Sequence, residues 1–89
     1  MQQAHYIQNI ACRVRKINNM VYLFGEGECF ELNELGNLIW VSLEKEKTLN
    51  EIVDIIEKEF DADRGTIEND ASAFIQQMLE ANMIISNAS

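Results

Sequence analysis

The pattern of apolar and polar residues along the first third of the chain gives three short strand-like runs, at residues 12–17 (CRVRKI), 20–24 (MVYLF) and 28–32 (ECFEL). The first run alternates with a period of two, and the second is apolar throughout and rich in aromatic and β-branched residues, both of which are typical of β-strands. Two short segments, Asn18-Asn19 and Gly25-Glu26-Gly27, separate the runs. Asn and Gly accept the positive φ that tight hairpin turns require. The pattern predicts a three-stranded antiparallel sheet in a simple meander.

After residue 32 the apolar residues recur every three or four positions, which is the period of a helix. We expect three helices, near residues 33–45, 48–61 and 64–83. Each helix starts at, or directly after, a residue that caps helices well. The second begins with the Thr-x-x-Glu pattern of a capping box. These capping residues are Asn33, Thr48 and Asp63.

The predicted fold is therefore α+β, with an N-terminal three-stranded antiparallel sheet followed by a three-helix bundle. A chain of 89 residues suits one domain with a single thin core, so residues 1–89 are expected to form one unit. The two ends, residues 1–10 and 85–89, show neither period, and we expect them to be flexible.

The chain is acidic, with 7 basic and 15 acidic residues and a net charge of −8. Segment 44–70 alone holds ten acidic and four basic residues. Affinity for nucleic acid and for anionic membranes depends largely on Lys and Arg, so the composition argues against both partners. No apolar run reaches the ~20 residues that span a bilayer. The first ten residues lack the pattern of a signal peptide, and we expect a cytoplasmic protein.

Two cysteines, Cys12 and Cys29, are too few for a disulfide scaffold or a zinc site of their own. They fall in the first and third predicted strands, which lie ~9.5 Å apart in a meander, beyond the reach of a disulfide. We expect two free, buried and unreactive thiols.

Catalytic chemistry has little support in the sequence. His5 is the only histidine, so Ser-His-Asp and Cys-His sites are unsupported. The segment Gly25-Glu26-Gly27 carries an acid where a nucleotide loop would hold phosphate. The acidic residues of 51–63 lack the spacing of a calcium loop. We expect no enzymatic activity, no metal and no cofactor, which leaves binding as the function.

A three-stranded sheet has two edges, each a row of backbone donors and acceptors. In the third predicted strand, Phe30 and Leu32 share one face, and Cys29 and Glu31 share the other. If the third helix lies beside this strand, an extended peptide could add to the sheet edge and place its side chains against the helix.

The residues of this region resemble the PqqD-like family. The resemblance is carried by FELNELGNLIW at 30–40, TLNEIV at 48–53, EFD at 59–61 and the spaced residues of 70–79, and it extends over about residues 12–84. It implies a winged-helix-like recognition element for ribosomally synthesised and post-translationally modified peptides. Such an element is a non-catalytic chaperone. It holds the leader of a precursor peptide as an added strand and presents it to a modifying enzyme, such as a radical SAM enzyme or a leader peptidase.

Carried over to this chain, the resemblance implies a peptide site made by the third strand and the third helix. Its residues are Cys29, Phe30, Glu31 and Leu32 on the strand, and Ile67, Asp70, Ala71, Phe74, Gln77 and Met78 on the helix. Two alternatives stay open: a winged-helix DNA-binding regulator, which the acidic helices disfavour, and a scaffold domain for enzyme assembly without a peptide ligand.

Overall fold

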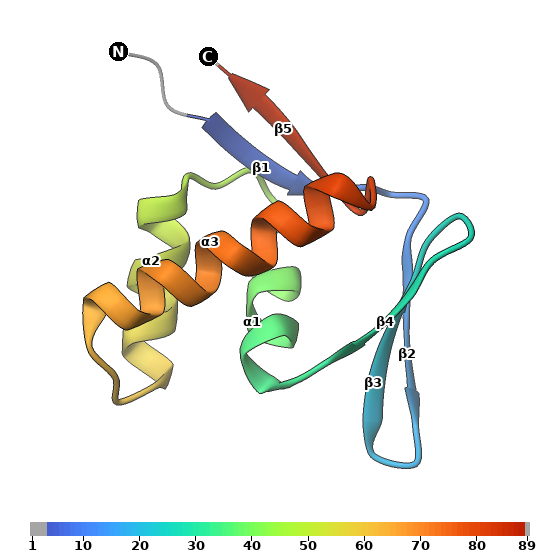
Figure 1. Cartoon of the computed structure of the whole chain (residues 1–89), viewed down its shortest axis with the longest axis horizontal. Helices are drawn as coiled ribbons and strands as arrows, with labels where there is room; N and C mark the ends of the chain where they lie inside the picture. The colour runs from blue at the N-terminus through green and yellow to red at the C-terminus, as the bar shows by residue number, and fades with distance from the viewer. Residues whose placement is uncertain (1–3, 89) are drawn as a thin grey trace.

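The computed structural model describes residues 4–88 and shows an α+β fold, as the sequence predicts (Figure 1). Three helices pack side by side, and a three-stranded sheet extends from one end of this bundle. The elements in chain order are β1 (Ala4–Gln8), β2 (Arg13–Ile17), β3 (Met20–Phe24), β4 (Cys29–Leu32), α1 (Glu34–Ser42), α2 (Leu49–Glu59), α3 (Arg64–Glu80) and β5 (Ile84–Ala88).

The predicted meander is confirmed, with β3 pairing antiparallel to β2 on one side and to β4 on the other. The β2–β3 turn places Asn18 at φ 52° and Asn19 at φ 68°, the left-handed pair that a tight two-residue hairpin needs. Strand β4 then runs directly into α1, where the Asn33 Oδ1 atom accepts a 2.7 Å hydrogen bond from the Gly36 N–H. This short connection fixes the direction of β4 relative to the helices.

The ends of the chain differ from the prediction, because β1 and β5 pair with each other in a second, two-stranded sheet. Tyr6 and Lys47 also exchange backbone hydrogen bonds of 2.8 and 3.0 Å, and the Asn9 side chain donates to the Asn82 carbonyl at 2.7 Å. Residues 4–8 and 85–88 are therefore strands rather than flexible ends. The predicted flexibility of residues 1–3 and 89 lies outside the described residues.

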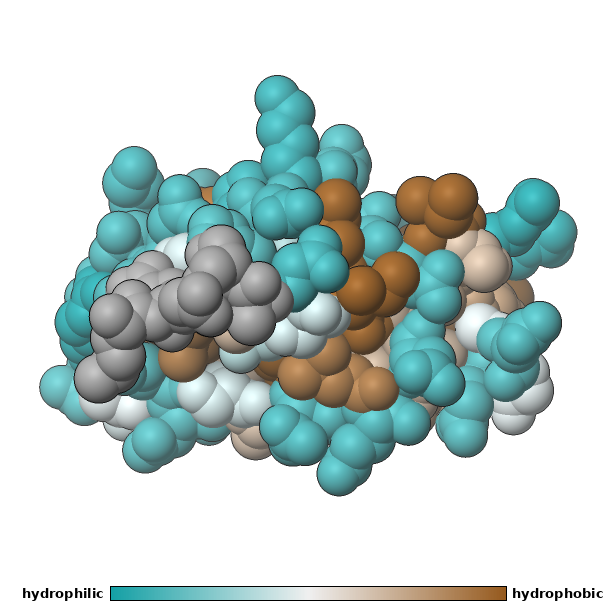
Figure 2. All heavy atoms as spheres, turned by 90° about the horizontal axis from the view of Figure 1, so that it is seen from above, coloured by the Kyte–Doolittle hydropathy of each residue, from teal (hydrophilic) through white to brown (hydrophobic). Residues whose placement is uncertain are grey.

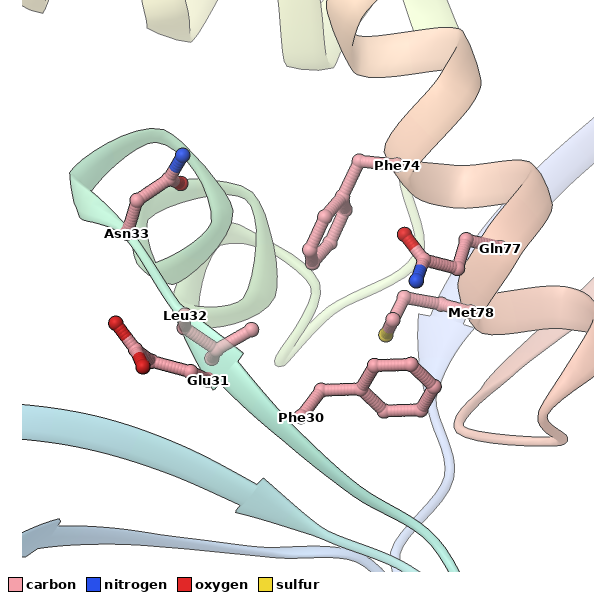
Figure 3. Close-up of a pocket in the computed structure, with 7 residues that line it drawn as sticks. All are labelled: Phe30, Glu31, Leu32, Asn33, Phe74, Gln77 and Met78. Atoms are coloured by element: carbon pink, nitrogen blue, oxygen red, sulfur yellow. The ribbon is translucent and has the colours of Figure 1, made fainter.

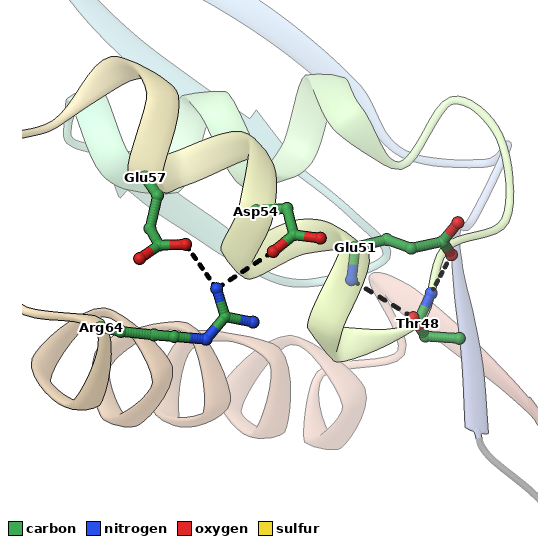
Figure 4. Close-up of polar contacts among 5 residues, drawn as sticks. All are labelled: Thr48, Glu51, Asp54, Glu57 and Arg64. Carbon is green, nitrogen blue, oxygen red and sulfur yellow. Dashed lines mark hydrogen bonds and ion pairs between the residues drawn. The ribbon is translucent and has the colours of Figure 1, made fainter.

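The helices begin at the predicted caps and end earlier than predicted, at Ser42, Glu59 and Glu80. Thr48 and Glu51 form both bonds of the capping box (Figure 4). In the same view, Arg64 at the start of α3 reaches two carboxylates of α2, with its Nη1 atom 3.0 Å from Asp54 Oδ1 and also bonded to Glu57. Arg64 thereby ties α3 to α2 at the surface.

One hydrophobic core joins the sheet to the helices. Leu23 of β3 and Leu32 of β4 are 0% and 5% exposed, and they pack with buried residues of all three helices and of β5. Seen from above, the surface is mostly hydrophilic, with hydrophobic groups at the centre and toward the side of the three-stranded sheet (Figure 2). Among the described residues, no helix is both long and apolar enough to cross a membrane.

Candidate functional site: the groove between β4 and α3

A cavity of about 330 Å³ lies between β4 and α3. Figure 3 shows its walls: Phe30 and Leu32 point from β4 into the space, Phe74 and Met78 approach from α3, and Glu31 points away. We call this cavity, together with the second one described below, the β4–α3 groove. The lining residues of the first cavity are Phe30, Glu31, Leu32, Asn33, Phe74, Gln77 and Met78.

Two local periodicities place these side chains. Alternation along β4 turns Phe30 and Leu32 toward the core and the helices. On α3, Phe74 and Met78 are four residues apart and so lie on one face of the helix. Phe30 and Phe74 are partly buried, whereas Met78 is 1% exposed. The result is an apolar floor with the Gln77 amide at its rim (Figure 3).

The backbone of β4 supplies the polar part of the groove. Gly25 N–H donates to the Glu28 carbonyl at 2.9 Å, and Leu23 pairs with Phe30 and Val21 with Leu32. Because antiparallel pairs alternate between bonded and non-bonded, Phe30 and Leu32 direct their N–H and C=O groups toward β3. Cys29 and Glu31 direct theirs away from the sheet, and no strand within residues 4–88 pairs with β4 on that side. These groups form a free edge that can accept another strand.

The groove continues along α3 into a second cavity of about 390 Å³. Asn33, Phe74 and Gln77 line both cavities, so the two are neighbours. The second cavity adds an exposed carboxylate, Asp70, one turn before Phe74. Its other lining residues are Leu35, Gly36 and Ala73.

Most of the residues predicted from the sequence lie together in the groove. Phe30, Glu31, Leu32, Phe74, Gln77 and Met78 line the first cavity, and Asp70 lines the second. Ile67 and Ala71 lie elsewhere: they are 3% and 0% exposed, belong to the core and line neither cavity. Because neither side chain lines a cavity of the groove, we leave both out of the site.

Four lining residues were not predicted from the sequence: Asn33, Leu35, Gly36 and Ala73. All except Ala73 belong to the first turn of α1 or to its cap. The sequence did contain a signal for these three residues. The helix cap directly follows the strand that ends at Leu32, without a linker, so the first turn of the helix has to lie next to the end of the strand.

Cys29 is exposed, contrary to the expectation of a buried thiol, because its side chain lies on the sheet face opposite to the core. Cys12 is half-buried, and burial raises the pKa of its thiol. Both thiols are free, as predicted. Within residues 4–88, no group of three or more His, Cys, Asp or Glu side chains is placed to hold a metal ion.

The sequence model of the family described as coenzyme PQQ synthesis protein D (PqqD) matches residues 19–84, which include the whole groove. The chain belongs to the PqqD family. A comparison with the curated proteins gives no match.

Solved structures of the same fold include one at 31% identity, TbiB1 in complex with the TbiA(beta) leader peptide. The match covers 88% of this chain and 93% of that chain, with a TM-score of 0.74. A protein that shares this fold at 31% identity has therefore been solved with a leader peptide bound.

Two more distant structures share the fold alone. Lasso peptide synthetase B1, complexed with the leader peptide, is 20% identical over 90% of this chain and 96% of that chain, with a TM-score of 0.74. The PqqD truncation of Methylobacterium extorquens PqqCD is described as a functional and stand-alone recognition element for ribosomally synthesised and modified peptides. It is 18% identical over 91% of this chain and 88% of that chain, with a TM-score of 0.75.

Proposed function

We propose that this protein binds the leader segment of a ribosomally synthesised precursor peptide and presents it to a modifying enzyme, without catalysing a reaction itself. The observation that carries the proposal is the free edge of β4 facing the apolar wall of α3. This arrangement supplies both parts of strand addition: backbone bonds for affinity and side-chain pockets for selectivity. The 31% identical relative TbiB1, solved with a leader peptide, supports the proposal.

The outward N–H and C=O groups of Cys29 and Glu31 would pair with the backbone of the peptide. Alternate peptide side chains, which point to one face of the added strand, would enter the first cavity and meet Phe30 and Phe74. Asp70 in the second cavity would attract a basic residue of the peptide. The partner enzyme would be of a class that acts on precursor peptides, such as a radical SAM enzyme or a leader peptidase.

A DNA-binding role has weaker support. The exposed basic residue of α3, Arg64, is already engaged by two carboxylates of α2. The remaining charged residues of that helix are acidic: Glu68, Asp70 and Glu80. Phosphate contacts need free basic side chains, and α3 offers none.

Glu31→Pro tests the proposal, because proline removes the N–H of residue 31 from the free edge and leaves the bonds of β4 to β3 in place. We expect the variant to fold and its affinity for the cognate leader peptide to fall about tenfold. Glu31→Ala is the matched control, since it changes the side chain and keeps the N–H. Its affinity in calorimetric titration should match that of the wild type.

Hydrogen exchange provides a test without substitution. Peptide addition should slow exchange of the Glu31 amide, which faces the free edge. The Phe30 amide, already bonded within the sheet, should change little. Equal affinity of the wild type and Glu31→Pro, or an unaltered exchange rate at Glu31, would exclude strand addition at β4 and favour a scaffold role.

A further inference from the structure

The three-stranded sheet has a second face that the core does not cover. Leu23 and Leu32 mark the core face, since both are buried. The register of β2 and β3 then assigns the opposite, outer face. On these two strands its residues are Arg13, Arg15, Ile17, Met20, Tyr22 and Phe24. Strand β4 adds Cys29 beside Phe24 and Glu31 beside Tyr22.

The outer face is more apolar than a solvated sheet face normally is. Ile17, Met20 and Phe24 are 47%, 38% and 36% exposed. The rings of Tyr22 and Phe24 lie with their centroids 6.3 Å apart, and Ile17 is the direct cross-strand partner of Met20. Neighbouring exposed apolar side chains of this kind mark interaction sites more often than isolated ones do.

Two arginines flank this apolar group. Arg13 pairs in register with Phe24, and Arg15 with Tyr22, so each arginine is the cross-strand neighbour of an aromatic residue on the same face. Neither arginine takes part in an ion pair within the described part of the chain. Arg, Tyr, Phe and Met are the residue types enriched at protein–protein interfaces.

Basic and acidic residues are also separated along the sequence. Residues 1–25 contain three of the seven basic residues and no acidic one, so all 15 acidic residues follow residue 25. Basic residues on an edge strand can protect a sheet from aggregation, which would account for the charges on β2. It would not account for the four apolar side chains on the same face.

We infer that the β2–β3 part of the outer face docks an acidic surface, with an apolar centre, on the enzyme that modifies the bound precursor. This inference rests on the proposed leader-binding function. The two surfaces differ in position, because the peptide would add to the edge of β4 beside α3, whereas the docking face centres on β2 and β3, with both arginines on β2 at the opposite edge of the sheet. One molecule could therefore hold the peptide and the enzyme at the same time.

A protein fits this face better than the other candidate partners. Single-stranded RNA can stack on aromatic residues of a sheet, but a net charge of −8 repels its phosphates. A second copy of this chain could place its acidic helices on the outer face. Such a head-to-tail contact would build a ring or a filament, which light scattering detects.

The test compares two double variants that change the net charge by the same amount. Arg13→Glu with Arg15→Glu alters the outer face, and Lys45→Glu with Lys58→Glu alters exposed positions away from the sheet. The probes are the purified modifying enzyme and its substrate's leader peptide. Circular dichroism first checks that both variants fold, and Phe24→Gln serves as a third variant without a charge change.

We expect the arginine variant to lose about tenfold or more in affinity for the enzyme at physiological salt, and the lysine variant to lose about twofold at most. Phe24→Gln should weaken enzyme binding without altering its salt dependence. All three variants should bind the leader as the wild type does. Failure of the wild type to bind the leader would reject the proposed function and not the docking surface.

Four results would overturn the inference. The first is equal loss of enzyme affinity in the two double variants. The second is loss of leader affinity in the arginine variant, which would show that the outer face takes part in leader binding. The third is self-association of the wild type that the arginine variant abolishes in light scattering. The fourth is micromolar binding of an oligouridine probe that depends on Arg13 and Arg15.

Discussion

Gly36 of α1 lies directly against the ring of Phe74 on α3. A Cβ atom at Gly36 would be 3.0 Å from Phe74 Cε1 and 3.2 Å from Asn33 Oδ1. Contacts this short force the neighbouring atoms to move, because protein interiors are closely packed. The missing side chain at residue 36 therefore allows the Phe74 ring to lie where it forms a wall of the groove.

Gly36→Ala should displace the Phe74 ring and weaken leader binding severalfold. The cost of overpacking, reduced by the better helix propensity of Ala, should lower the free energy of unfolding by about 1 kcal/mol. Gly65→Ala is the matched control for leader binding, since Gly65 lines neither cavity and a Cβ there would meet only Asp63 Oδ2, the capping oxygen of α3, at 3.1 Å. Calorimetry and urea denaturation give the two quantities. Unchanged leader affinity in Gly36→Ala would show that the Phe74 wall does not contact the peptide.

Asp70 should contribute charge selectivity to leader binding. Asp70→Arg reverses an exposed charge that lines the second cavity, so the fold should persist and a leader with Lys or Arg should bind more weakly, by about 1 kcal/mol or less. Glu68→Arg makes the same change on the same helix at a residue that lines neither cavity, and should have a smaller effect. The difference should shrink in titrations at high salt. Equal effects of the two variants would indicate only a change in overall charge.

Local patterns were sufficient to predict the meander, the helices and their caps. The Asn18-Asn19 turn, the Thr48–Glu51 box and the cap at Asn33 each depend on residues within a few positions of one another. Strands β1 and β5 were missed because each has its partner about 80 residues away. Neither strand alternates regularly, and pairing at that distance leaves no local signal.

The sequence predicted the position of the groove, between the third strand and the third helix, but not all of its lining residues. The apolar stripe of α3 includes Ile67 and Ala71 as well as Phe74 and Met78, and periodicity does not reveal which part of a stripe faces α2. In the structure, the packing of α2 and α3 buries Ile67 and Ala71. Cys29 was misjudged for a related reason: only one face of the sheet is covered, and its side chain lies on the other.

The capping box of α2 should make stability depend on pH. The hydrogen bond from the Thr48 backbone N–H to the Glu51 carboxylate lowers the pKa of Glu51 from its ordinary value. A carboxyl whose folded-state pKa is lowered stabilises the fold above its unfolded-state pKa, and this contribution is lost as the pH falls through the folded-state value. The advantage of the wild type over Glu51→Gln should therefore be present at pH 7 and shrink below about pH 4.

Urea denaturation at several pH values measures this dependence. Thr48→Ala removes the other half of the box and should cost about 1 kcal/mol at pH 7. Asp61→Asn is a control for general loss of a carboxylate, since Asp61 lies after α2 and takes no part in the box. If the stability of Glu51→Gln follows that of the wild type at every pH, the box does not contribute through the charge of Glu51.

The two thiols differ in surroundings in a way that reports on the groove. Cys12 lies close to Gly25 and Met83, and burial raises the pKa of its thiol. Cys29 is exposed on the outer face of the sheet, while its backbone belongs to the free edge of β4. Thiolate character and access both control alkylation, so Cys29 should be the faster thiol.

Treatment with iodoacetamide, followed by mass spectrometry, should therefore modify Cys29 before Cys12. A leader strand added to β4 places its own side chains next to Cys29 on the outer face, so saturating peptide should slow alkylation of Cys29. Cys12 serves as the internal control, because its half-buried thiol lies away from the free edge and its rate should not change. Faster reaction of Cys12 would contradict the packing of that thiol. An unchanged rate at Cys29 would mean that the bound peptide does not extend along β4 to this residue.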